Sequence, residues 1–203
     1  MVTAEFFVGI DEAGRGPIAG PVAVGAFCVE KNARKKLSKF FPGGKIRDSK
    51  KLSPVAREKI FQELVRQKRN GAISFAVSFG SATEIDRKGI TFAIRKALAR
   101  SVNILGVKPN KCSVLLDGSL KAPEKFINQR TIIKGDEKEA VIALASIVAK
   151  VSRDRIMINF AKKYPDYGFE IHKGYGTKKH YQALKVLGFS RIHRRSFLKN
   201  VGK

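Results

Sequence analysis

Residues 5–24 read EFFVGIDEAGRGPIAGPVAV, two apolar runs separated by one polar turn. The run Phe6–Ile10 predicts a buried strand, and it ends at two adjacent carboxylates, Asp11 and Glu12. The second run predicts another strand over residues 22–29. Carboxylates at a strand end, beside glycines that expose backbone N–H groups, can hold an oxygen-ligated metal next to a phosphate.

The turn between the two runs contains an arginine between two glycines, Gly14-Arg15-Gly16. An adjacent Asp-Glu pair is more often a solvated turn than a site, and a single arginine is more often a surface charge. The combination of both features at one strand end favours a functional turn over either explanation alone.

The chain is strongly basic. It has 203 residues and a formal net charge of +24, from 41 Lys and Arg against 17 Asp and Glu. This charge indicates a polyanionic partner, nucleic acid first and an anionic membrane surface second. A generally basic proteome or a ribosome-associated role would also explain it. The length and the 43% hydrophobic content fit one domain with a real core, with room for a small appendage.

The cysteines and the apolar runs favour a cytoplasmic protein. Cys28 and Cys112 lie in apolar runs without CxxC spacing, which predicts buried, reduced thiols. The longest apolar run, 141–149, is too short to span a bilayer, and no secretory signal is evident. We expect no membrane association.

The remaining elements follow from periodicity and turn signals. Further strands are expected at 72–79, 112–116 and 129–133. Four helices are expected. One begins at Ser53-Pro54 and ends at Asn70-Gly71, and one covers 177–187. One is capped by Thr83 and continues to Leu105, with a start after Gly89 as the alternative because a glycine inside a helix is unfavourable. One opens with the capping box Asp136-x-x-Glu139 and runs to about Lys163.

This order predicts an α/β fold, a mixed sheet with helices on its faces. Asp117 ends a strand as Asp11 does, so parallel strands ending at one edge would place the two side by side. Small residues along one side of the helix over 136–163 would permit close packing on the sheet.

Four carboxylates are candidates for one metal site: Asp11, Glu12, Asp117 and Asp154. Gathered without a cation they would repel one another, and oxygen ligands select Mg²⁺ or Mn²⁺. Two such ions about 3.5–4 Å apart would stabilise the attacking and leaving oxygens of a phosphoryl transfer.

Each carboxylate also has a simpler explanation. Asp154 could pair with Arg153, Arg155 or Lys150 of its own helix, and Asp117 could merely open a turn. Residue by residue, these explanations are the commoner ones.

Seven segments resemble one family, bacterial ribonuclease HII. They cover the chain nearly end to end, in the family's order: GIDEAGRGPIAGPV (9–22), DSKKLS (48–53), LLDG (115–118), KGD (134–136), ASIVAKVSRDR (145–155), HKGYGT (172–177) and HRRSF (193–197). The resemblance implies a ribonuclease H-like mixed five-stranded sheet flanked by helices. It also implies two units, a catalytic domain over 1–163 and a C-terminal helical extension over 164–203 that carries a substrate-reading tyrosine loop.

The resemblance also implies roles for individual residues. It makes Asp11, Glu12, Asp117 and Asp154 the catalytic carboxylates that bind two Mn²⁺ or Mg²⁺ ions, with water attacking in line. Gly14, Arg15 and Gly16 match the loop that senses the ribonucleotide 2′-OH, the group that marks RNA, and Tyr175 matches a tyrosine packed on the adjacent sugar. Ser49, Lys50 and Lys134 fit contacts to backbone phosphates.

The activity implied is hydrolysis of the phosphodiester 5′ of ribonucleotides, both in RNA/DNA hybrids and at single ribonucleotides in duplex DNA. We expect a monomer, without the N-terminal domain of the related type 3 enzymes. Two other hypotheses stay open. One is another nuclease of the same fold, such as a junction resolvase, and the other is a non-catalytic basic RNA-binding protein.

Overall fold

The computed structural model describes residues 4–45 and 52–198. Its centre is a five-stranded sheet in the order β3-β2-β1-β4-β5. The strands are β1 (Phe6–Ala13), β2 (Val22–Glu30), β3 (Ser74–Gly80), β4 (Cys112–Asp117) and β5 (Gln129–Ile132). The predicted mixed sheet is confirmed, because β1 pairs antiparallel with β2 and parallel with β4.

The strand register decides where the acidic strand ends meet. Ile10 of β1 lies opposite Leu116 of β4 in the parallel pair. The next residue of each strand is a carboxylate, so Asp11 and Asp117 are neighbours at one edge of the sheet. The predicted juxtaposition of these two side chains is therefore confirmed.

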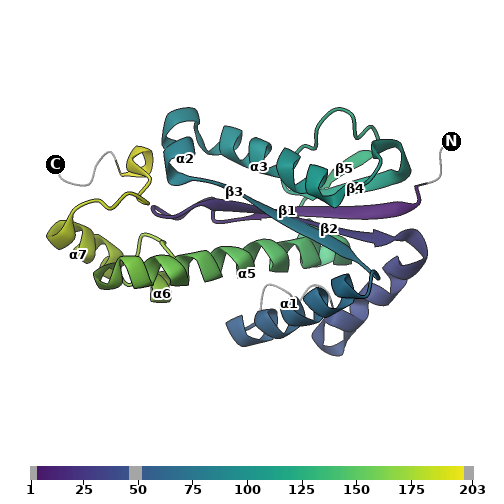
Figure 1. The fold of residues 1–203 in the computed structure, drawn as a ribbon, viewed down its shortest axis with the longest axis horizontal. Helices are drawn as coiled ribbons and strands as arrows, with labels where there is room; N and C mark the ends of the chain where they lie inside the picture. Colours follow the sequence, from purple (N-terminus) through teal and green to yellow (C-terminus); the bar gives the residue numbers. More distant parts are fainter. Residues whose placement is uncertain (1–3, 46–51, 199–203) are drawn as a thin grey trace.

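Helices cover both faces of the sheet (Figure 1). One face packs on α5 (Ala140–Lys163), α1 (Pro54–Arg69) and the 3₁₀ segment η1 (Lys31–Phe40), and the other on α2 (Ala82–Lys88) and α3 (Ile90–Leu105). The shorter helices are η2 (Pro42–Gly44), η4 (Pro109–Lys111), α4 (Gly135–Lys138), η5 (Pro165–Tyr167), α6 (Phe169–His172), α7 (Lys178–Leu187) and η6 (Arg195–Phe197).

Helix α5 lies unusually close to the central strands. A Cβ atom added to Gly9 of β1 would stand 2.1 Å from the carbonyl carbon and oxygen of Val141. One added to Gly25 of β2 would stand 2.3 Å from the carbonyl oxygen of Ala145. The predicted small side of this helix thus faces the sheet, and glycines on the strands complete the close approach.

The predicted cap at Ser53 is confirmed, and the predicted helix over 177–187 also begins with a side-chain cap. The Ser53 hydroxyl accepts a hydrogen bond from Ala56 N at 3.1 Å at the start of α1. The Thr177 hydroxyl accepts one from His180 N at 3.3 Å at the start of α7.

The predicted cap at Thr83 is wrong. Ser81 caps α2 instead, because its hydroxyl accepts the N–H of Glu84 at 3.1 Å. The helix predicted to reach Leu105 is broken at Gly89, whose φ of 82° lies outside the helical region and separates α2 from α3.

The predicted capping box at Asp136 and Glu139 is also wrong. Asp136 lies inside the short helix α4, and Glu139 is the residue before α5, with no side-chain cap. The Glu139 carboxylate pairs instead with Arg34 at 2.5 Å, so it is not available to reach back along its own chain.

The described part of the C-terminal segment forms a third, small core. Tyr167, Phe169 and Leu184 are buried there against Ile18 of the β1–β2 turn and Met157 of α5. Helix α7 and the start of β1 lie at opposite ends of the molecule (Figure 1). The division at residue 163 itself stays a prediction.

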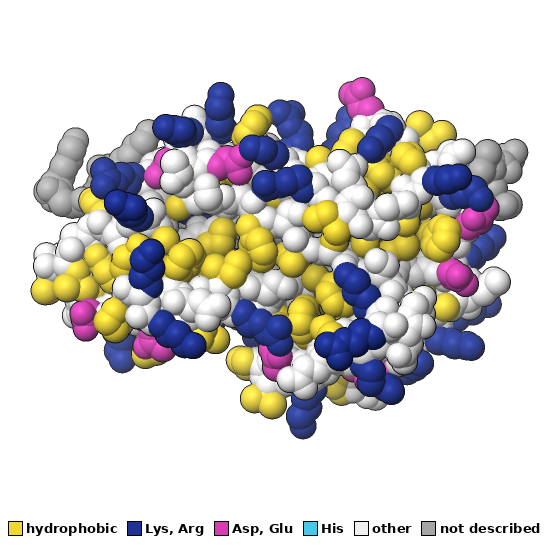
Figure 2. All heavy atoms as spheres, in the orientation of Figure 1, with side chains coloured by type: hydrophobic (Ala, Val, Ile, Leu, Met, Phe, Trp, Pro, Cys, Tyr) yellow, Lys and Arg dark blue, Asp and Glu magenta, His cyan; other side chains and the backbone are white. Residues whose placement is uncertain are grey.

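The predicted thiol state fits the structure, since Cys28 and Cys112 are both buried and unbonded. Within residues 4–45 and 52–198, no helix is both long and apolar enough to cross a membrane. Figure 2 shows Lys and Arg side chains spread over the visible face, with far fewer Asp and Glu.

The glycine contacts under α5 predict that an added methyl group destabilises the protein at Gly9 but not at Gly16. Gly9→Ala should lower the free energy of unfolding by about 1–3 kcal/mol or more, because the new Cβ would overlap the helix backbone. Gly16→Ala is the matched control, since nothing lies within 4 Å of its Cβ position. Urea denaturation would measure both, and equal stability of the two variants would contradict this account of the packing.

Candidate active site

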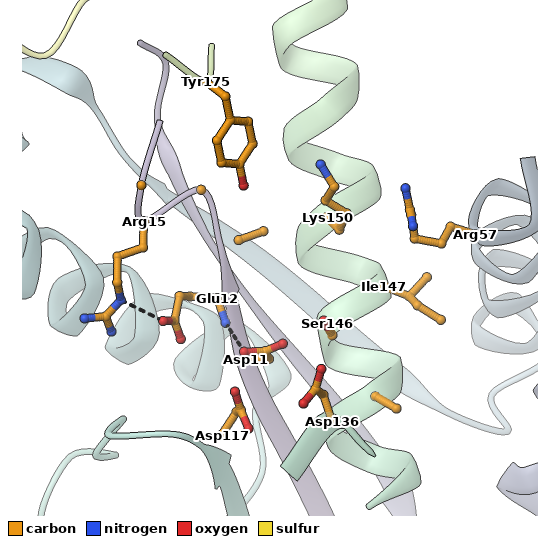
Figure 3. Close-up of a pocket in the computed structure, with 14 residues that line it drawn as sticks. Asp11, Glu12, Arg15, Arg57, Asp117, Asp136, Ser146, Ile147, Lys150 and Tyr175 are labelled. Atoms are coloured by element: carbon orange, nitrogen blue, oxygen red, sulfur yellow. Dashed lines mark hydrogen bonds and ion pairs between the residues drawn. The ribbon is translucent and has the colours of Figure 1, made fainter. Parts of the chain in front are cut away.

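A pocket of about 470 Å³ opens where β1 and β4 end (Figure 3). Its acidic members are Asp11, Glu12, Asp117 and Asp136. The other lining residues are Ala13, Gly14, Arg15, Gly16, Arg57, Ala143, Ser146, Ile147, Lys150 and Tyr175. Several parts of the fold therefore meet here: the two strand ends with the glycine turn, α1, the helix pair α4–α5 and the loop that precedes α7.

Three aspartates surround one part of this pocket (Figure 3). Asp11 and Asp136 are 6% and 4% exposed, so neither carboxyl group is a solvated surface charge. Asp117 accepts a hydrogen bond from the backbone N–H of Gly135 at 2.6 Å, which ties the end of β4 to the start of α4. Lys134, the residue before Gly135, has a left-handed φ of 55°, and this conformation lets the chain turn into α4.

Glu12 stands on the side of the glycine turn. Its carboxylate accepts a hydrogen bond from Arg15 Nε at 2.9 Å, and its N–H donates to the Asp11 carboxylate at 2.7 Å. The arginine is therefore paired with the acidic group, while its side chain stays 47% exposed.

The environment of Asp11 strongly favours its neutral form. Burial is the largest cause, and the neighbouring carboxylates of Glu12 and Asp117 add to it; together they raise the pKa of Asp11 to about 8. Hydrogen bonds from the Ser146 side chain and the Glu12 backbone only partly offset this. A carboxyl group this poorly compensated would gain from a nearby cation.

The donor set suits a hard divalent cation, since it is made of carboxylate oxygens with a hydroxyl close by. As they stand, however, no three Asp, Glu, His or Cys side chains of the described residues converge on one ion position. The pocket thus has the chemistry for a metal, and its side chains would turn to complete the ligation.

The structure places one predicted carboxylate outside the pocket. Asp154 does not line the pocket; it pairs with Lys150 one helical turn away, at 2.8 Å. This is the simpler explanation that the sequence left open for Asp154. Asp136 holds the fourth acidic position instead, carried there by α4.

A buried guanidinium holds the glycine turn in place. Arg194 is 0% exposed, and it donates hydrogen bonds to the carbonyl oxygens of Gly14, Arg15 and Gly20 at 2.7, 2.9 and 2.9 Å. Burial and then the nearby Arg153 lower the pKa of Arg194 to about 9. These contacts point the turn's carbonyl oxygens inward.

A second buried arginine supports the same turn from α5. Arg153 donates to the carbonyl oxygens of Pro21 at 2.8 Å and Ala19 at 3.2 Å. A Cβ added to Gly14, whose φ is 90°, would lie 2.0 Å from Arg153 Nε. Glycine is therefore required at position 14 by both backbone conformation and space, whereas Gly16 faces open space.

Tyr175 is held at the rim of the pocket by the C-terminal extension. Its side chain is 44% exposed, and its carbonyl oxygen is hydrogen-bonded to His180 Nδ1 at 2.9 Å. The preceding Gly174 accepts the N–H groups of Ile18 and Ala19 at 2.9 and 3.2 Å. The tyrosine loop and the glycine turn are thus joined directly.

The predicted phosphate-contacting residues have mixed outcomes. Ser49 and Lys50 lie outside the described residues. Lys134 is exposed and does not line the pocket. Two cations that the sequence analysis did not select, Arg57 of α1 and Lys150 of α5, do line it (Figure 3).

One sequence signal for Asp136 was present. Asp136 lies three residues beyond the end of the predicted strand 129–133, whereas Asp11 and Asp117 follow their strands directly. No local signal marks Arg153 or Arg194 as supports of the turn, because their partners lie 132–180 residues away in the chain.

Comparison with known proteins finds relatives along nearly the whole chain. A family model described as Ribonuclease HII matches residues 8–200. Ribonuclease HII of Caldicellulosiruptor bescii is 45% identical over 196 residues, which cover 97% of this chain and 88% of that relative. The structure is similar to ribonuclease H2 from Pyrococcus horikoshii OT3, with a TM-score of 0.76 and 26% identity over 97% of this chain and 96% of that one.

A second solved structure is a complex, PCNA:RNase HII from Archaeoglobus fulgidus. Its matching chain has a TM-score of 0.74 and 26% identity, with 93% of each chain covered.

The raised pKa of Asp11 predicts that replacing this aspartate with a neutral residue stabilises the metal-free protein, and increasingly so as the pH rises. An unfolded aspartate titrates near 3.9, so metal-free wild-type protein should lose stability relative to Asp11→Asn as the pH rises from 5 to 8, by up to about 1.4 kcal/mol per unit. Denaturation in chelator at several pH values would measure this. Parallel stability curves for the two proteins would show that Asp11 ionises freely.

The two neighbouring arginines of the C-terminal extension should differ sharply. Arg194→Met leaves three buried carbonyl oxygens without their donor and should cost about 3 kcal/mol or more. Arg195→Met, at an exposed side chain, should stay within about 0.5 kcal/mol of wild type. Thermal unfolding of both variants measures the difference, and similar losses would contradict the role of Arg194.

Proposed function

The chain belongs to the ribonuclease HII family, and from this premise we propose that it is a divalent-metal-dependent enzyme that cuts on the 5′ side of ribonucleotides. That it is a ribonuclease H with endonuclease activity follows from the family. The proposal adds the substrates, RNA/DNA hybrids and single ribonucleotides in duplex DNA, and the way this site reads them.

One observation carries the proposal: the acidic pocket and the open glycine turn lie side by side. Asp11, Glu12, Asp117 and Asp136 line the same cavity as Arg15 and Gly16. A nucleic acid strand crossing this cavity would present its phosphodiester to the carboxylates and the adjoining sugar to the turn.

Asp11, Glu12, Asp117 and Asp136 would hold the metal ions, Mg²⁺ or Mn²⁺. Bound there, such ions supply an activated water and stabilise the negative charge that develops on the leaving oxygen. Asp136 replaces Asp154 in this set because α4 brings it into the pocket while Asp154 is held by Lys150. The high pKa of Asp11 gives the protein itself a reason to bind cations at this point.

The glycine turn is suited to recognising a ribose. Gly16 has open space around its Cα, so a sugar 2′-OH can approach the backbone there. Arg194 and Arg153 occupy carbonyl oxygens of the turn on its buried side, which leaves donors on the outer side for the substrate. Tyr175, half exposed at the rim, offers an aromatic face to the neighbouring sugar or base.

Cations around the pocket would hold backbone phosphates. Lys150 and Arg57 line it directly, on the side away from Arg15 (Figure 3). Ser49, Lys50 and Lys134 are proposed for the same task on sequence grounds. In a chain of net charge +24, such contacts would make substrate affinity fall steeply with salt.

The C-terminal extension, residues 164–203, is proposed to act as part of the site by carrying Tyr175 and Arg194. That the protein works in the cytoplasm as a monomer stays a prediction.

The proposal is tested with a labelled DNA duplex that contains one ribonucleotide, incubated with Mg²⁺, with Mn²⁺ or with chelator. We expect metal-dependent cutting 5′ of the ribonucleotide. Asp136→Asn should lower kcat at least 100-fold, roughly the contribution of one group acting on the reacting atoms. Asp154→Asn, a matched change outside the pocket, should lower it less than about 5-fold, an allowance for its ion pair with Lys150.

The reverse order, with Asp154→Asn inactive and Asp136→Asn active, would overturn the assignment of the fourth carboxylate. Cutting of an all-DNA junction without any cutting at the ribonucleotide would overturn the proposed substrate.

A further inference from the structure

A second depression adjoins the active site on the other side of Arg15. It has a volume of about 160 Å³ and lies between α3 and the segment that follows β4. We call it the α3 pocket; it is lined by Arg15, Thr91, Ile94, Arg95, Leu98, Ser119, Leu120 and Lys121. Arg15 lines both cavities, so the two are neighbours that share this side chain.

The chemistry of the α3 pocket is that of an anion site. Its polar lining consists of three cations and two hydroxyls, and no carboxylate belongs to it. Arg95 and Lys121 are exposed, and in the described part of the chain neither forms an ion pair. Their charge is therefore available to a ligand.

The pocket is built on rigid elements. Ile94, Leu98 and Leu120 form its floor and belong to the buried core on this face of the sheet. The chain after β4 turns back through a hydrogen bond from Leu120 N to the Asp117 carbonyl oxygen at 3.2 Å. The Leu120 carbonyl oxygen in turn accepts the Thr131 hydroxyl at 3.2 Å.

The α3 pocket also lies at a defined reach from the reacting centre. Lys121 follows the metal-binding candidate Asp117 by four residues, so their Cα atoms are at most about 14 Å apart. A nucleic acid strand advances about 3.4 Å per nucleotide along its axis. A phosphate in the α3 pocket would therefore be within a few nucleotides of the one that is cut.

We propose that the α3 pocket binds one backbone phosphate of the substrate duplex, distinct from the scissile phosphate. Arg95 and Lys121 pair with its charge, and the hydroxyls of Thr91 and Ser119 donate hydrogen bonds to its oxygens. The volume is below that of pockets that enclose a drug-sized molecule, which suits a single phosphodiester group rather than a free nucleotide. This inference rests on the proposed function and adds a second phosphate-binding position to it.

The phosphate could belong to the ribonucleotide-containing strand or to its complement. Both offer the same chemistry, and their phosphates face each other across the duplex grooves. Two clamped phosphates, one cut and one held, would fix the register of the duplex on the carboxylates, as backbone contacts do in nucleic acid recognition generally.

The first experiment compares two double variants with the same loss of charge. Arg95→Gln with Lys121→Gln removes both cations of the α3 pocket. Lys31→Gln with Lys108→Gln is the control, because these exposed lysines line depressions near Phe6, at the opposite end of β1. The probe is a DNA duplex with one ribonucleotide, bound in chelator at several salt concentrations.

We expect the α3-pocket variant to weaken binding at least 10-fold and to reduce the magnitude of the slope of log K against log[salt] by about one, as loss of one phosphate contact requires. The control should keep both the slope and the cleavage rate of wild type. Equal slopes for the two double variants would overturn the proposal.

The second experiment locates the phosphate. Single methylphosphonate linkages, which are neutral, replace one phosphate at a time in either strand of the same duplex. At one linkage, a few nucleotides from the ribonucleotide, the neutral substitution should weaken binding by the wild-type protein. The α3-pocket variant should bind that duplex as tightly as it binds the unmodified one. The strand that carries this linkage identifies the source of the phosphate. If, at every linkage, the neutral substitution weakens binding by the same factor in the variant as in wild type, the proposal is overturned.

The two proposals fail in different ways. If wild-type protein binds this duplex with the expected dependence on Arg95 and Lys121 but does not cut it, the proposed function fails and the anion site stands. If it cuts the duplex and the variant binds like the control, the anion site fails and the proposed function stands.

Discussion

The close approach of α5 to the two central strands is the constraint on which the rest of the structure depends. Gly9 and Gly25 leave no room for a side chain beneath the helix backbone. This approach sets Ser146 and Lys150 of α5 beside Asp11, and it brings the preceding helix α4, with Asp136, to the end of β4. A wider separation would still leave a sheet and a helix, but the acidic pocket would open into a shallow groove.

The second constraint is the use of buried arginines as scaffolding. Burying a guanidinium destabilises the folded state unless its N–H donors are satisfied. Arg194 satisfies them by donating three hydrogen bonds to carbonyl oxygens of the glycine turn. A turn rich in glycine would otherwise be conformationally free. Its shape is therefore imposed from outside, by α5 and by the C-terminal extension, which explains why the extension and the turn share one small core.

These constraints also reconcile an acidic centre with a basic protein. Most cations lie on the surface, where they can attract a polyanion, while Asp11 and Asp136 are almost fully buried. Arg15 stands at the boundary, paired with Glu12 and lining both the acidic pocket and the α3 pocket. The surface cations that would attract the substrate and the buried carboxylates that would bind metal ions thus occupy different places, with Arg15 at the boundary.

Local patterns were sufficient for much of this. Alternation and apolar runs located the five strands, and the pair Ser53-Pro54 located the cap of α1. The pairing of Asp11 with Asp117 followed from topology alone, because parallel neighbours end at the same edge. The motifs of the family identified the glycine turn and Tyr175, both of which line the pocket.

Two features were decided only by the tertiary structure. Asp136 and Asp154 are both aspartates with charged neighbours in the sequence, and only Asp136 lines the pocket. Asp136 lies on α4, whose C-cap residue is Glu139, and Glu139 forms an ion pair with Arg34, 105 residues away. The supports of the glycine turn, Arg153 and Arg194, likewise act on carbonyl oxygens far away in sequence. The sequence by itself determined the strands, the caps and the acidic strand ends, because these depend on bonds between near neighbours or on strand order. The fourth carboxylate and the rigid turn depend on long-range contacts that exist only once α5 and the C-terminal extension have packed.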